Sequence, residues 1–423
     1  MIARNITPKL LDALLDTPVV LLHGARQTGK STLVRSLASR EHPAEYVTLD
    51  DATAMSAAAS DPEGFLAGLG ERVVLDEAQR VPALFHAIKA EVDRFRRPGR
   101  FLLTGSADVF LLPSLSEALA GRIEILTLWP FSQGELESVK DNFVDKVFAT
   151  RQNQGSRRRT GVRGTPPPSP LKRSDMFGRV LAGGFPEAVA RKAGPRRTAW
   201  FGSYVTTILQ RDVRDLANIE RATELPRLLA LLAARATSLL NYAELSRSLG
   251  LPQSTLKRYM ALFETTFLVH SVPAWAANLG KRLVKSPKAM LCDTGLMAHL
   301  LGLSQSPADL RPDLIGPLLE NFAFVELRKQ ATWSEIQPRI YHFRTQTGQE
   351  VDIILEDGAG NVVGIEVKAA AAVTAKDFAP LRFLSETLGE RFVAGVVLYT
   401  GHRSVPFAAN LHALPLSALW TSG

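Results

Sequence analysis

The chain has 423 residues, of which 46% are hydrophobic, a net charge of +8 and a single cysteine, Cys292. This length exceeds one ordinary hydrophobic core, so we expect two or three domains. One cysteine excludes an internal disulfide and a multi-cysteine zinc site. No uncharged apolar run reaches about eighteen residues, and Asp12 and Asp16 interrupt the N-terminal apolar stretch. We therefore expect no membrane span and no signal peptide, and we expect a cytoplasmic protein.

The positive charge is concentrated in residues 151–173, which are rich in Arg, Pro, Gly and Ser and contain no acidic residue. This segment carries +7, which leaves +1 for the rest of the chain. Its composition cannot bury a core, so we predict a disordered insertion. The insertion would either contact nucleic acid electrostatically or be a solvated loop. Elsewhere, a basic face for nucleic acid would have to be local.

Apolar runs and helical patterns alternate over the first part of the chain. We predict helices at 6–15, 30–40, 82–96 and 113–119, and strands at 18–23, 45–49, 72–75, 100–104 and within 123–129. Strands that alternate with helices favour an α/β fold with a parallel sheet.

The turn between the first strand and the second helix has the spacing of a phosphate-binding loop: Gly, four residues, Gly, Lys, Ser. Gly24 and Gly29 allow the backbone N–H groups to face phosphate oxygens, and the helix start adds a positive dipole end. Lys30 would contact the β- and γ-phosphates of ATP, and the Ser31 hydroxyl would ligate Mg²⁺. The alternative is a glycine-rich turn without a ligand. The predicted ATP-binding residues of this loop are Gly24, Ala25, Arg26, Gln27, Thr28, Gly29, Lys30, Ser31 and Thr32.

The strand at 72–75 leads into two acidic residues. Asp76 would hold Mg²⁺, directly or through water, and Glu77 would orient and deprotonate the attacking water. Two acids after a strand are common at protein surfaces, so the pair alone does not indicate a metal site. The phosphate loop upstream is what favours a catalytic interpretation. Gln79 would assist at the γ-phosphate or begin a solvated helix.

Hydroxyl groups follow the next strand, and two arginines lie further along. Thr104 or Ser106 would be a polar sensor beside the γ-phosphate, or would cap a turn. Arg122 and Arg211 compete as the arginine that stabilises γ-phosphate charge on a neighbouring subunit of a homo-oligomer. Each is otherwise a surface ion-pair residue.

Six motifs, in order, are GARQTGKS, VVLDEAQ, LLTGSA, LAGR, GGFPE and ILQRDV. With these motifs the chain resembles the prokaryotic AAA-type ATP-binding proteins that carry a C-terminal domain of unknown function. The resemblance covers nearly the whole chain, apart from the basic insertion. It implies a P-loop core of the ASCE type and ATP hydrolysis, and it implies little about biological role.

Residues 176–275 have a mainly helical pattern, with a tight turn at 251–253 between two short helices. This arrangement predicts a helix-turn-helix, with wing strands within 267–275 and 282–291. The cations expected to neutralise DNA phosphates are Lys257, Arg258, Lys281, Arg282, Lys285 and Lys288. The alternative is a winged helix that binds a protein.

Period-two strands dominate the chain after about residue 337. Glu366 and Lys368 share one face of a strand, and a hairpin would bring Asp352 alongside. Two carboxylates can bind Mg²⁺, and the lysine can polarise an attacking water. The pattern resembles the PD-(D/E)xK nuclease motif, with Glu320 as the upstream acid and metal ligand and Glu326 as its alternative. A surface Glu–Lys pair and a nuclease relative without activity are the competing interpretations.

Four parts are predicted: an AAA-type core at 1–135, a helical lid at 136–215, a winged helix at 216–300 and a restriction-endonuclease-like αβ domain at 301–423. The predicted function is a Mg²⁺-dependent ATPase coupled to DNA binding or processing. The alternative function is a nucleotide-controlled switch, in which the winged helix binds protein and the nuclease-like domain is catalytically silent.

Overall fold

The computed structural model describes residues 2–106, 119–149, 171–212, 222–277, 285–303, 306–345 and 347–421. Most of the predicted helix at 113–119, residues 151–170 of the predicted insertion, and Lys281 and Arg282 lie outside these ranges. The chain divides into two compact units. The first contains residues 1, 3–131 and 261–268, and the second contains residues 2, 132–260 and 269–423. The finer division into four parts stays a prediction.

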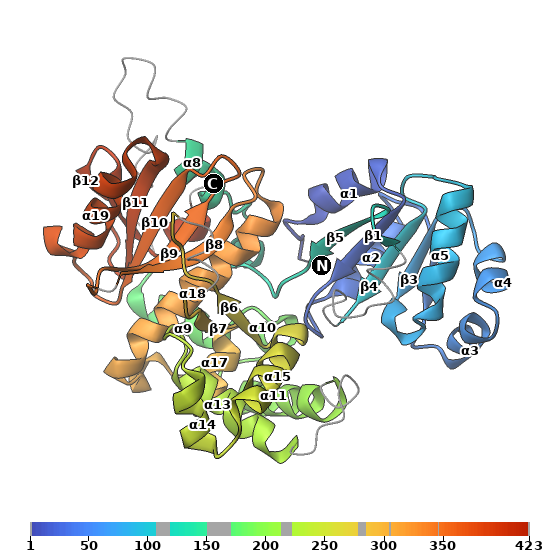
Figure 1. The fold of residues 1–423 in the computed structure, drawn as a ribbon, viewed down its shortest axis with the longest axis horizontal. Helices are drawn as coiled ribbons and strands as arrows, with labels where there is room; N and C mark the ends of the chain where they lie inside the picture. The colour runs from blue at the N-terminus through green and yellow to red at the C-terminus, as the bar shows by residue number, and fades with distance from the viewer. Residues whose placement is uncertain are drawn as a thin grey trace. The chain divides into compact units, whose positions relative to one another are not determined.

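The first unit alternates helices and strands as predicted from the sequence (Figure 1). Its elements are α1 (Thr7–Asp16), β1 (Val19–His23), α2 (Lys30–Ala38), β2 (Glu45–Thr48), α3 (Ala52–Ser60), α4 (Pro62–Ala67), β3 (Val73–Asp76), η1 (Ala78–Arg80), α5 (Ala83–Arg94), β4 (Phe101–Gly105) and β5 (Ile123–Thr127).

The five strands of the first unit form one parallel sheet in the order β2-β3-β4-β1-β5. Strands β1, β3 and β4 are buried at every position, which explains their continuous apolar runs. The carboxyl ends of parallel strands meet at one edge of a sheet, where ligands of open α/β folds bind. Because β4 lies between β1 and β3, its end lies between the phosphate loop and the acidic pair.

The core of the first unit forms where α5 packs on this sheet. Phe85 and Ile88 of α5 belong to one buried cluster with Leu21, Leu75 and Leu103, which come from three neighbouring strands. Helix α2 also contacts β3 and β4 and has its own buried apolar residues. The sheet is therefore held between helices, and the positions of its strand ends are fixed.

The second unit begins with a helical region. Its elements up to residue 309 are α7 (Gln133–Glu137), α8 (Phe143–Ala149), α9 (Arg173–Ala182), α10 (Pro186–Val189), α11 (Pro195–Thr207), η3 (Ile208–Asp212), η4 (Ala222–Glu224), α13 (Leu225–Ala234), α14 (Tyr242–Leu249), α15 (Gln253–Thr265), β6 (Val269–Val272), β7 (Lys288–Leu291), α17 (Thr294–Leu300) and η5 (Pro307–Asp309). From residue 261 onward, α15 groups with the first unit.

The predicted pair of short helices is present as α14 and α15. Asn241 caps α14 by accepting a hydrogen bond from the Glu244 N–H, and Gly250 ends the helix in the left-handed conformation. Strands β6 and β7 pair antiparallel, as expected for a wing. Two short helices and a strand pair are therefore present, and both the winged-helix fold and a DNA-binding role stay predictions.

A six-stranded mixed sheet forms the rest of the second unit, in the order β12-β13-β11-β10-β9-β8. Its elements are α18 (Pro312–Trp333), β8 (Arg339–Arg344), β9 (Glu350–Glu356), β10 (Val362–Lys368), η6 (Ala375–Phe378), α19 (Ala379–Leu388), η7 (Gly389–Arg391), β11 (Phe392–Tyr399), β12 (Val405–Ala408), β13 (Leu411–Pro415) and α20 (Ala418–Thr421). Strands β8, β9 and β10 are antiparallel neighbours, whereas β11 and β13 run parallel to β10.

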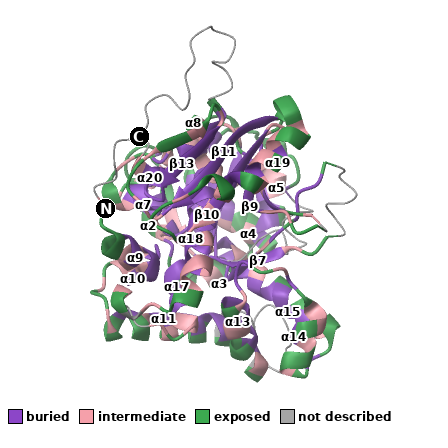
Figure 2. Cartoon of the chain, turned by 90° about the vertical axis from the view of Figure 1, so that its left-hand side faces the viewer, coloured by how far each residue is buried: buried purple, intermediate pink, exposed green. Residues whose placement is uncertain are grey.

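Burial follows this arrangement, because β11 is buried at every position and β10 at all but its last two (Figure 2). Leu381 and Leu384 of α19 share a buried cluster with Ile354 and Val397 of the sheet. Helix α18 begins at Pro312, and proline is well tolerated in a first helical turn. Every helix in the described ranges is too short or too polar to cross a bilayer.

Candidate active site

The phosphate loop curls because two glycines take conformations that other residues avoid. Gly24 and Gly29 have φ of +148° and +95°, and Gly29 precedes the first residue of α2. A Cβ on Gly24 would lie 2.2 Å from the Leu128 carbonyl oxygen. Gln27 is also left-handed, with φ of +61°. The loop therefore has the compact backbone that a phosphate-binding turn requires.

Lys30 is folded back on this loop. Its Nζ donates to the carbonyl oxygens of Gly24 and Ala25, both at 2.8 Å. The loop is also fixed from outside by Arg4, which donates to the Thr28 carbonyl at 2.8 Å. The motif did not include Arg4, since it lies twenty residues upstream in sequence.

Ser31 and Asp76 meet at the edge of the sheet where the strands end. Ser31 Oγ donates to Asp76 Oδ1 at 3.0 Å, and Asp76 is 3% exposed. Adjacent oxygens of an octahedral Mg²⁺ shell with ligands at about 2.1 Å are about 3.0 Å apart. The two oxygens thus have the chemistry and the separation of neighbouring magnesium ligands.

Thr104, at the end of β4, links the two acidic residues. Its Oγ1 donates to Asp76 Oδ1 at 2.5 Å and accepts a hydrogen bond from the Glu77 N–H at 2.9 Å. Thr104 is fully buried. The structure therefore places this predicted sensor as a brace behind the acidic pair.

Tyr46 is a residue of this site that sequence reasoning missed. Its hydroxyl donates to the second oxygen of Asp76, Oδ2, at 2.6 Å. Burial and this hydrogen bond raise the pKa of Tyr46, so the hydroxyl keeps its proton at neutral pH. Arg35 of α2 donates to the Tyr46 oxygen at 3.1 Å and lies 4.6 Å from the ring centre. Asp76 is therefore held from three sides.

Glu77 has a left-handed backbone, with φ of +59°, which is costly for a residue with a Cβ. Its Oε2 accepts hydrogen bonds from Gln79 Nε2 at 2.5 Å and from Ser106 Oγ at 3.2 Å. Gln79 and Ser106 are also 3.2 Å apart. The structure thus brings Glu77 together with Gln79 and Ser106, two of the three polar residues predicted near the γ-phosphate.

His23, the last residue of β1, lies close to this site. Burial and the positive charge of Lys30 lower the pKa of His23 to about 4, so the imidazole is neutral at pH 7. Its Nε2 lies 2.7 Å from Thr127 Oγ1. His23 is therefore a polar strand-end residue beside the loop.

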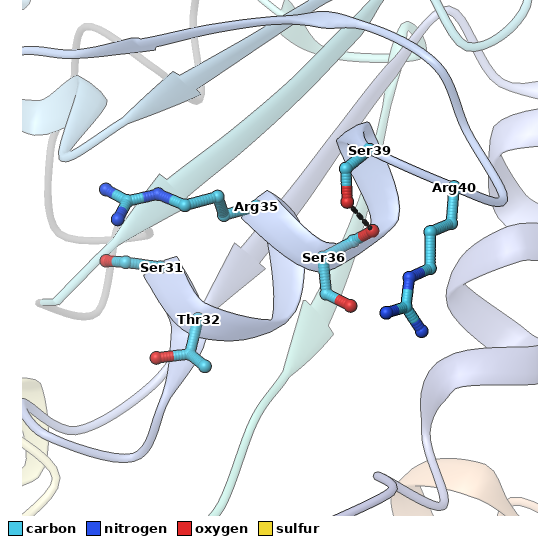
Figure 3. A pocket seen from close by; sticks show the side chains of 6 residues that line it. All are labelled: Ser31, Thr32, Arg35, Ser36, Ser39 and Arg40. Carbon is cyan, nitrogen blue, oxygen red and sulfur yellow. Dashed lines mark hydrogen bonds between the residues drawn. The ribbon is translucent and has the colours of Figure 1, made fainter. Parts of the chain in front are cut away.

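A pocket of about 340 Å³ extends from Ser31 along the outer side of α2 (Figure 3). Its lining consists of hydroxyl and guanidinium groups, from Ser31, Thr32, Arg35, Ser36, Ser39 and Arg40. Such groups suit phosphate or sugar oxygens better than an apolar ring.

Arg122 is not brought to the phosphate loop. It lies just before β5, at the amino-terminal ends of the strands, whereas the phosphate loop lies at their carboxyl ends. It forms a two-pronged ion pair with Asp93 of α5 at 2.5 and 2.9 Å. Because β5 runs parallel to β1, Arg122 lies at the end of the sheet away from the phosphate loop of its own chain. A role toward a neighbouring subunit stays a prediction. The side chain of Arg211 lies outside the described part of the chain.

The predicted C-terminal residues do meet in the second unit. Asp352 of β9 accepts a hydrogen bond from the Val367 N–H of β10 at 2.9 Å. Lys368 Nζ donates to Glu366 Oε2 at 2.7 Å, so these two residues share a face as predicted. Burial and the charge of Asp352 raise the pKa of Glu366 to about 7. Oε1 of Glu366 is buried and has no hydrogen-bond partner among the residues that the structure describes.

Lys288 joins this cluster, which corrects one prediction. Its Nζ lies 2.8 Å from Glu320 and Glu350 and 3.8 Å from Asp352, and its side chain is 2% exposed. A buried cation that is neutralised by carboxylates cannot contact a DNA phosphate, so Lys288 is not part of a DNA-binding wing. Lys285 is exposed, and its Nζ donates to the Arg344 carbonyl at 3.2 Å.

Glu320, and not Glu326, is the upstream acid of this cluster. Glu326 is buried elsewhere, where it accepts hydrogen bonds from the Gln133 N–H at 2.8 Å and from Lys329 Nζ at 2.5 Å. Burial and the charge of Asp352 raise the pKa of Glu320 to about 8, and they outweigh the attraction of Lys288. In the described part of the chain, no group of three or more His, Cys, Asp or Glu residues is arranged to hold a metal ion.

Three family models match separate parts of the chain. Residues 16–137 match an AAA domain, residues 173–307 match a domain of unknown function (DUF8612), and residues 315–419 match a second one (DUF4143). The AAA match covers the strands and loops of the candidate active site. The first unit therefore contains an AAA-type, nucleotide-binding P-loop ATPase domain.

Two relatives match along nearly the whole of this chain. The uncharacterized proteins Rv2008c of Mycobacterium tuberculosis and Mb2031c of Mycobacterium bovis are each 31% identical over 426 residues, covering 99% of this chain and 85% of theirs. A solved STAND protein with a tetratricopeptide repeat sensor, PH0952 from Pyrococcus horikoshii, is 10% identical with a TM-score of 0.24. That match covers 79% of this chain, which spans 47% of that structure, and it is too weak to support an argument. This chain combines an AAA-type P-loop ATPase domain with two domains of unknown function, and it belongs to the same family as the two mycobacterial proteins.

Proposed function

We propose that this protein is a Mg²⁺-dependent ATPase whose turnover is coupled to DNA binding. The observation that carries the ATPase proposal is the position of Asp76, which contacts the Ser31 hydroxyl at 3.0 Å and is braced by Tyr46 and Thr104. A bound Mg²⁺ would be held by Ser31 and Asp76 and would offset negative charge on the triphosphate.

The loop residues have separate roles in this proposal. The backbone N–H groups between Gly24 and Lys30 bind phosphate oxygens, and Lys30 exchanges its two carbonyl partners for the β- and γ-phosphates. Glu77 accepts a proton from the attacking water, while Gln79 and Ser106 orient its carboxylate. Thr104 positions Glu77 through the backbone N–H.

Coupling to DNA is supported by the exposed cations of the α14–α15 helix pair. Lys257 and Arg258 of α15 and Arg247 of α14 are exposed. Cations on a helix-turn-helix can neutralise backbone phosphates, and no group there indicates base-specific contact. The second candidate function is a nucleotide-controlled switch with a catalytically silent C-terminal domain. The burial of Lys288 among carboxylates favours a C-terminal domain without catalytic activity.

The test compares three variants for ATP binding and for ATP hydrolysis with and without duplex DNA. Lys30→Ala should weaken ATP binding by about 10- to 100-fold, since hydrogen bonds to charged groups contribute about 1.5–3 kcal/mol. Glu77→Gln should retain binding and lower kcat by about 10²- to 10⁴-fold. Arg94→Ala, an exposed arginine on α5, is the control and should match the parent.

Two results would reject the ATPase proposal: no ATP binding by the folded parent in Mg²⁺, or parental turnover in Glu77→Gln. Slow turnover that DNA does not change, together with a nucleotide-dependent change in oligomer size, would favour the switch.

A further inference from the structure

The carboxylate cluster of the second unit already contains a cation from the chain itself. Lys288 Nζ contacts Glu320 of α18 and Glu350 of β9, each at 2.8 Å, and lies 3.8 Å from Asp352. These carboxylates come from two elements that converge on one ammonium group. The residues present therefore do not fit a divalent metal as they stand, because the ammonium occupies the point where the carboxylates meet.

The position of Lys288 is fixed by its backbone. In β7 it pairs with Val272 of β6 on one side and forms an isolated bridge with Leu239 on the other. Three residues further along β7, Leu291 exchanges two hydrogen bonds with the buried side chain of Asn321, at 2.8 and 3.0 Å. Asn321 follows Glu320 directly on α18. The two hydrogen bonds between Leu291 and Asn321 therefore fix the position of α18 along β7 and align Glu320 with Lys288.

Burial makes this arrangement costly to change. The side chains of Glu320 and Asp352 are 14% and 15% exposed, against 2% for Lys288. Removing one partner of a buried ion pair leaves an uncompensated charge, which is strongly unfavourable. A divalent ion at the same carboxylates would have to displace the Lys288 ammonium group, and it would be repelled by the positive charge of that group at short range.

We propose that Lys288 is a built-in counter-ion that replaces a divalent metal in the C-terminal carboxylate cluster, and that removal of its ammonium opens a divalent-cation site there. The proposal is independent of ATP hydrolysis. It assigns the second unit a nuclease-like scaffold whose cluster takes no metal in the native chain. Lys368, which is partly exposed and pairs with Glu366, remains in place beside the cluster.

The experiment is a Mn²⁺ titration of the full chain without nucleotide, in which electron paramagnetic resonance measures the free Mn²⁺ at each step. All proteins carry Asp76→Asn, so that the phosphate loop contributes no metal site. The parent should show no saturable Mn²⁺ site. Lys288→Met, which keeps the side-chain length, should gain one saturable site that binds Mn²⁺ at least about tenfold more tightly than the residual, non-saturating binding of the parent. Adding Asp352→Asn should remove this site. Lys285→Met, the exposed lysine three residues away, should behave as the parent.

Lys288→Met carries excess buried negative charge and is expected to be less stable. Lys288→Met with Glu320→Gln reduces that charge and keeps Glu350, Asp352 and Glu366, so it should fold and should be stabilised by Mn²⁺ in thermal unfolding. A Mn²⁺ site in the parent that Asp352→Asn abolishes would overturn the proposal. So would a folded Lys288→Met protein, single or combined with Glu320→Gln, that gains no site.

Discussion

The hydroxyl of Ser31 lies 3.0 Å from Oδ1 of Asp76, although 45 positions separate the two residues in the sequence. This contact connects the first turn of α2 to the end of β3 across the top of β4. Its length equals the spacing of adjacent oxygens around Mg²⁺, so little rearrangement is needed for both to become ligands. The groups that hold Asp76 in this orientation should therefore affect metal affinity.

Tyr46→Phe tests the first of these groups. Loss of the hydroxyl that donates to Asp76 Oδ2 at 2.6 Å should raise the Mg²⁺ concentration at half-maximal ATPase activity by about tenfold, because one hydrogen bond to a charged group is lost. The measurement is a Mg²⁺ titration of ATPase activity at saturating ATP. Tyr399→Phe, whose hydroxyl donates to the Arg403 carbonyl in the second unit, is the matched control. Equal midpoints for Tyr46→Phe and the parent would show that Tyr46 does not position Asp76.

Thr104→Val tests the brace behind the acidic pair. Valine has the same shape but leaves Asp76 Oδ1 without one donor and the Glu77 N–H without its acceptor. The variant should lose about 1–3 kcal/mol of unfolding free energy, as for other buried polar groups left unpaired, and its kcat should fall. Urea unfolding and steady-state ATPase assays measure the two effects. Thr104→Ser keeps the hydroxyl and should therefore retain most of the unfolding free energy and most of the kcat. If it does not, the methyl group of Thr104, and not its hydroxyl, supports the acidic pair.

The sequence predicts the phosphate loop well because the whole motif is local. Gly24 to Ser31 are contiguous, and the curled backbone follows from two glycines and a helix start. Tyr46 could not be predicted in this way. Its contact with Asp76 depends on the parallel pairing of β2 with β3, which opposes Tyr46 to Val74 and Thr48 to Asp76. No local pattern specifies which strands become neighbours.

Lys288 shows the opposite failure, where a local pattern gave the wrong interpretation. A lysine in a short strand after a helix-turn-helix is typical of a DNA-binding wing. Its burial is decided by Glu320 and Glu350, which approach it only when α18 and β9 fold against β7. Likewise, only the tertiary structure selects Glu320 over Glu326 as the acid of the cluster. The carboxylate hairpin itself was predictable, because the i, i+2 rule and a short turn are local.

Asp141 predicts a pH dependence of stability. Burial and the negative charge of Glu326 raise the pKa of Asp141 to about 7, against 3.8 for an ordinary aspartate. Between these values the folded chain binds more protons than the unfolded chain, so the free energy of unfolding should fall as pH rises from about 4 to about 7. The fall is at most about 1.4 kcal/mol per pH unit for one group.

Asp141→Asn should remove this contribution, because the amide cannot ionise. The measurement is the difference in unfolding free energy between the variant and the parent at several pH values. The control is Asp145→Asn on α8, whose carboxylate accepts a hydrogen bond from Ser334 Oγ. If the difference between Asp141→Asn and the parent does not change from pH 4 to pH 7, then Asp141 does not hold its proton in the folded state.

The exposed cations of α15 give the last prediction, which separates the two candidate functions. Each phosphate contact that is lost should reduce the slope of log K against log salt by about one, so Lys257→Gln with Arg258→Gln should reduce it by about two and should weaken binding to all duplex sequences equally. Fluorescence anisotropy with two unrelated duplexes at several salt concentrations measures both quantities. Lys376→Gln, an exposed lysine of η6, is the control.

The same pair of substitutions should also abolish stimulation of ATP hydrolysis by DNA while leaving the basal rate unchanged, because neither residue belongs to the phosphate loop. If the parent binds DNA with a slope that Lys257→Gln and Arg258→Gln do not alter, the helix pair is not the DNA-binding surface. If the parent does not bind DNA at all, the DNA-coupled reaction is rejected, and the nucleotide-controlled switch remains as the candidate function.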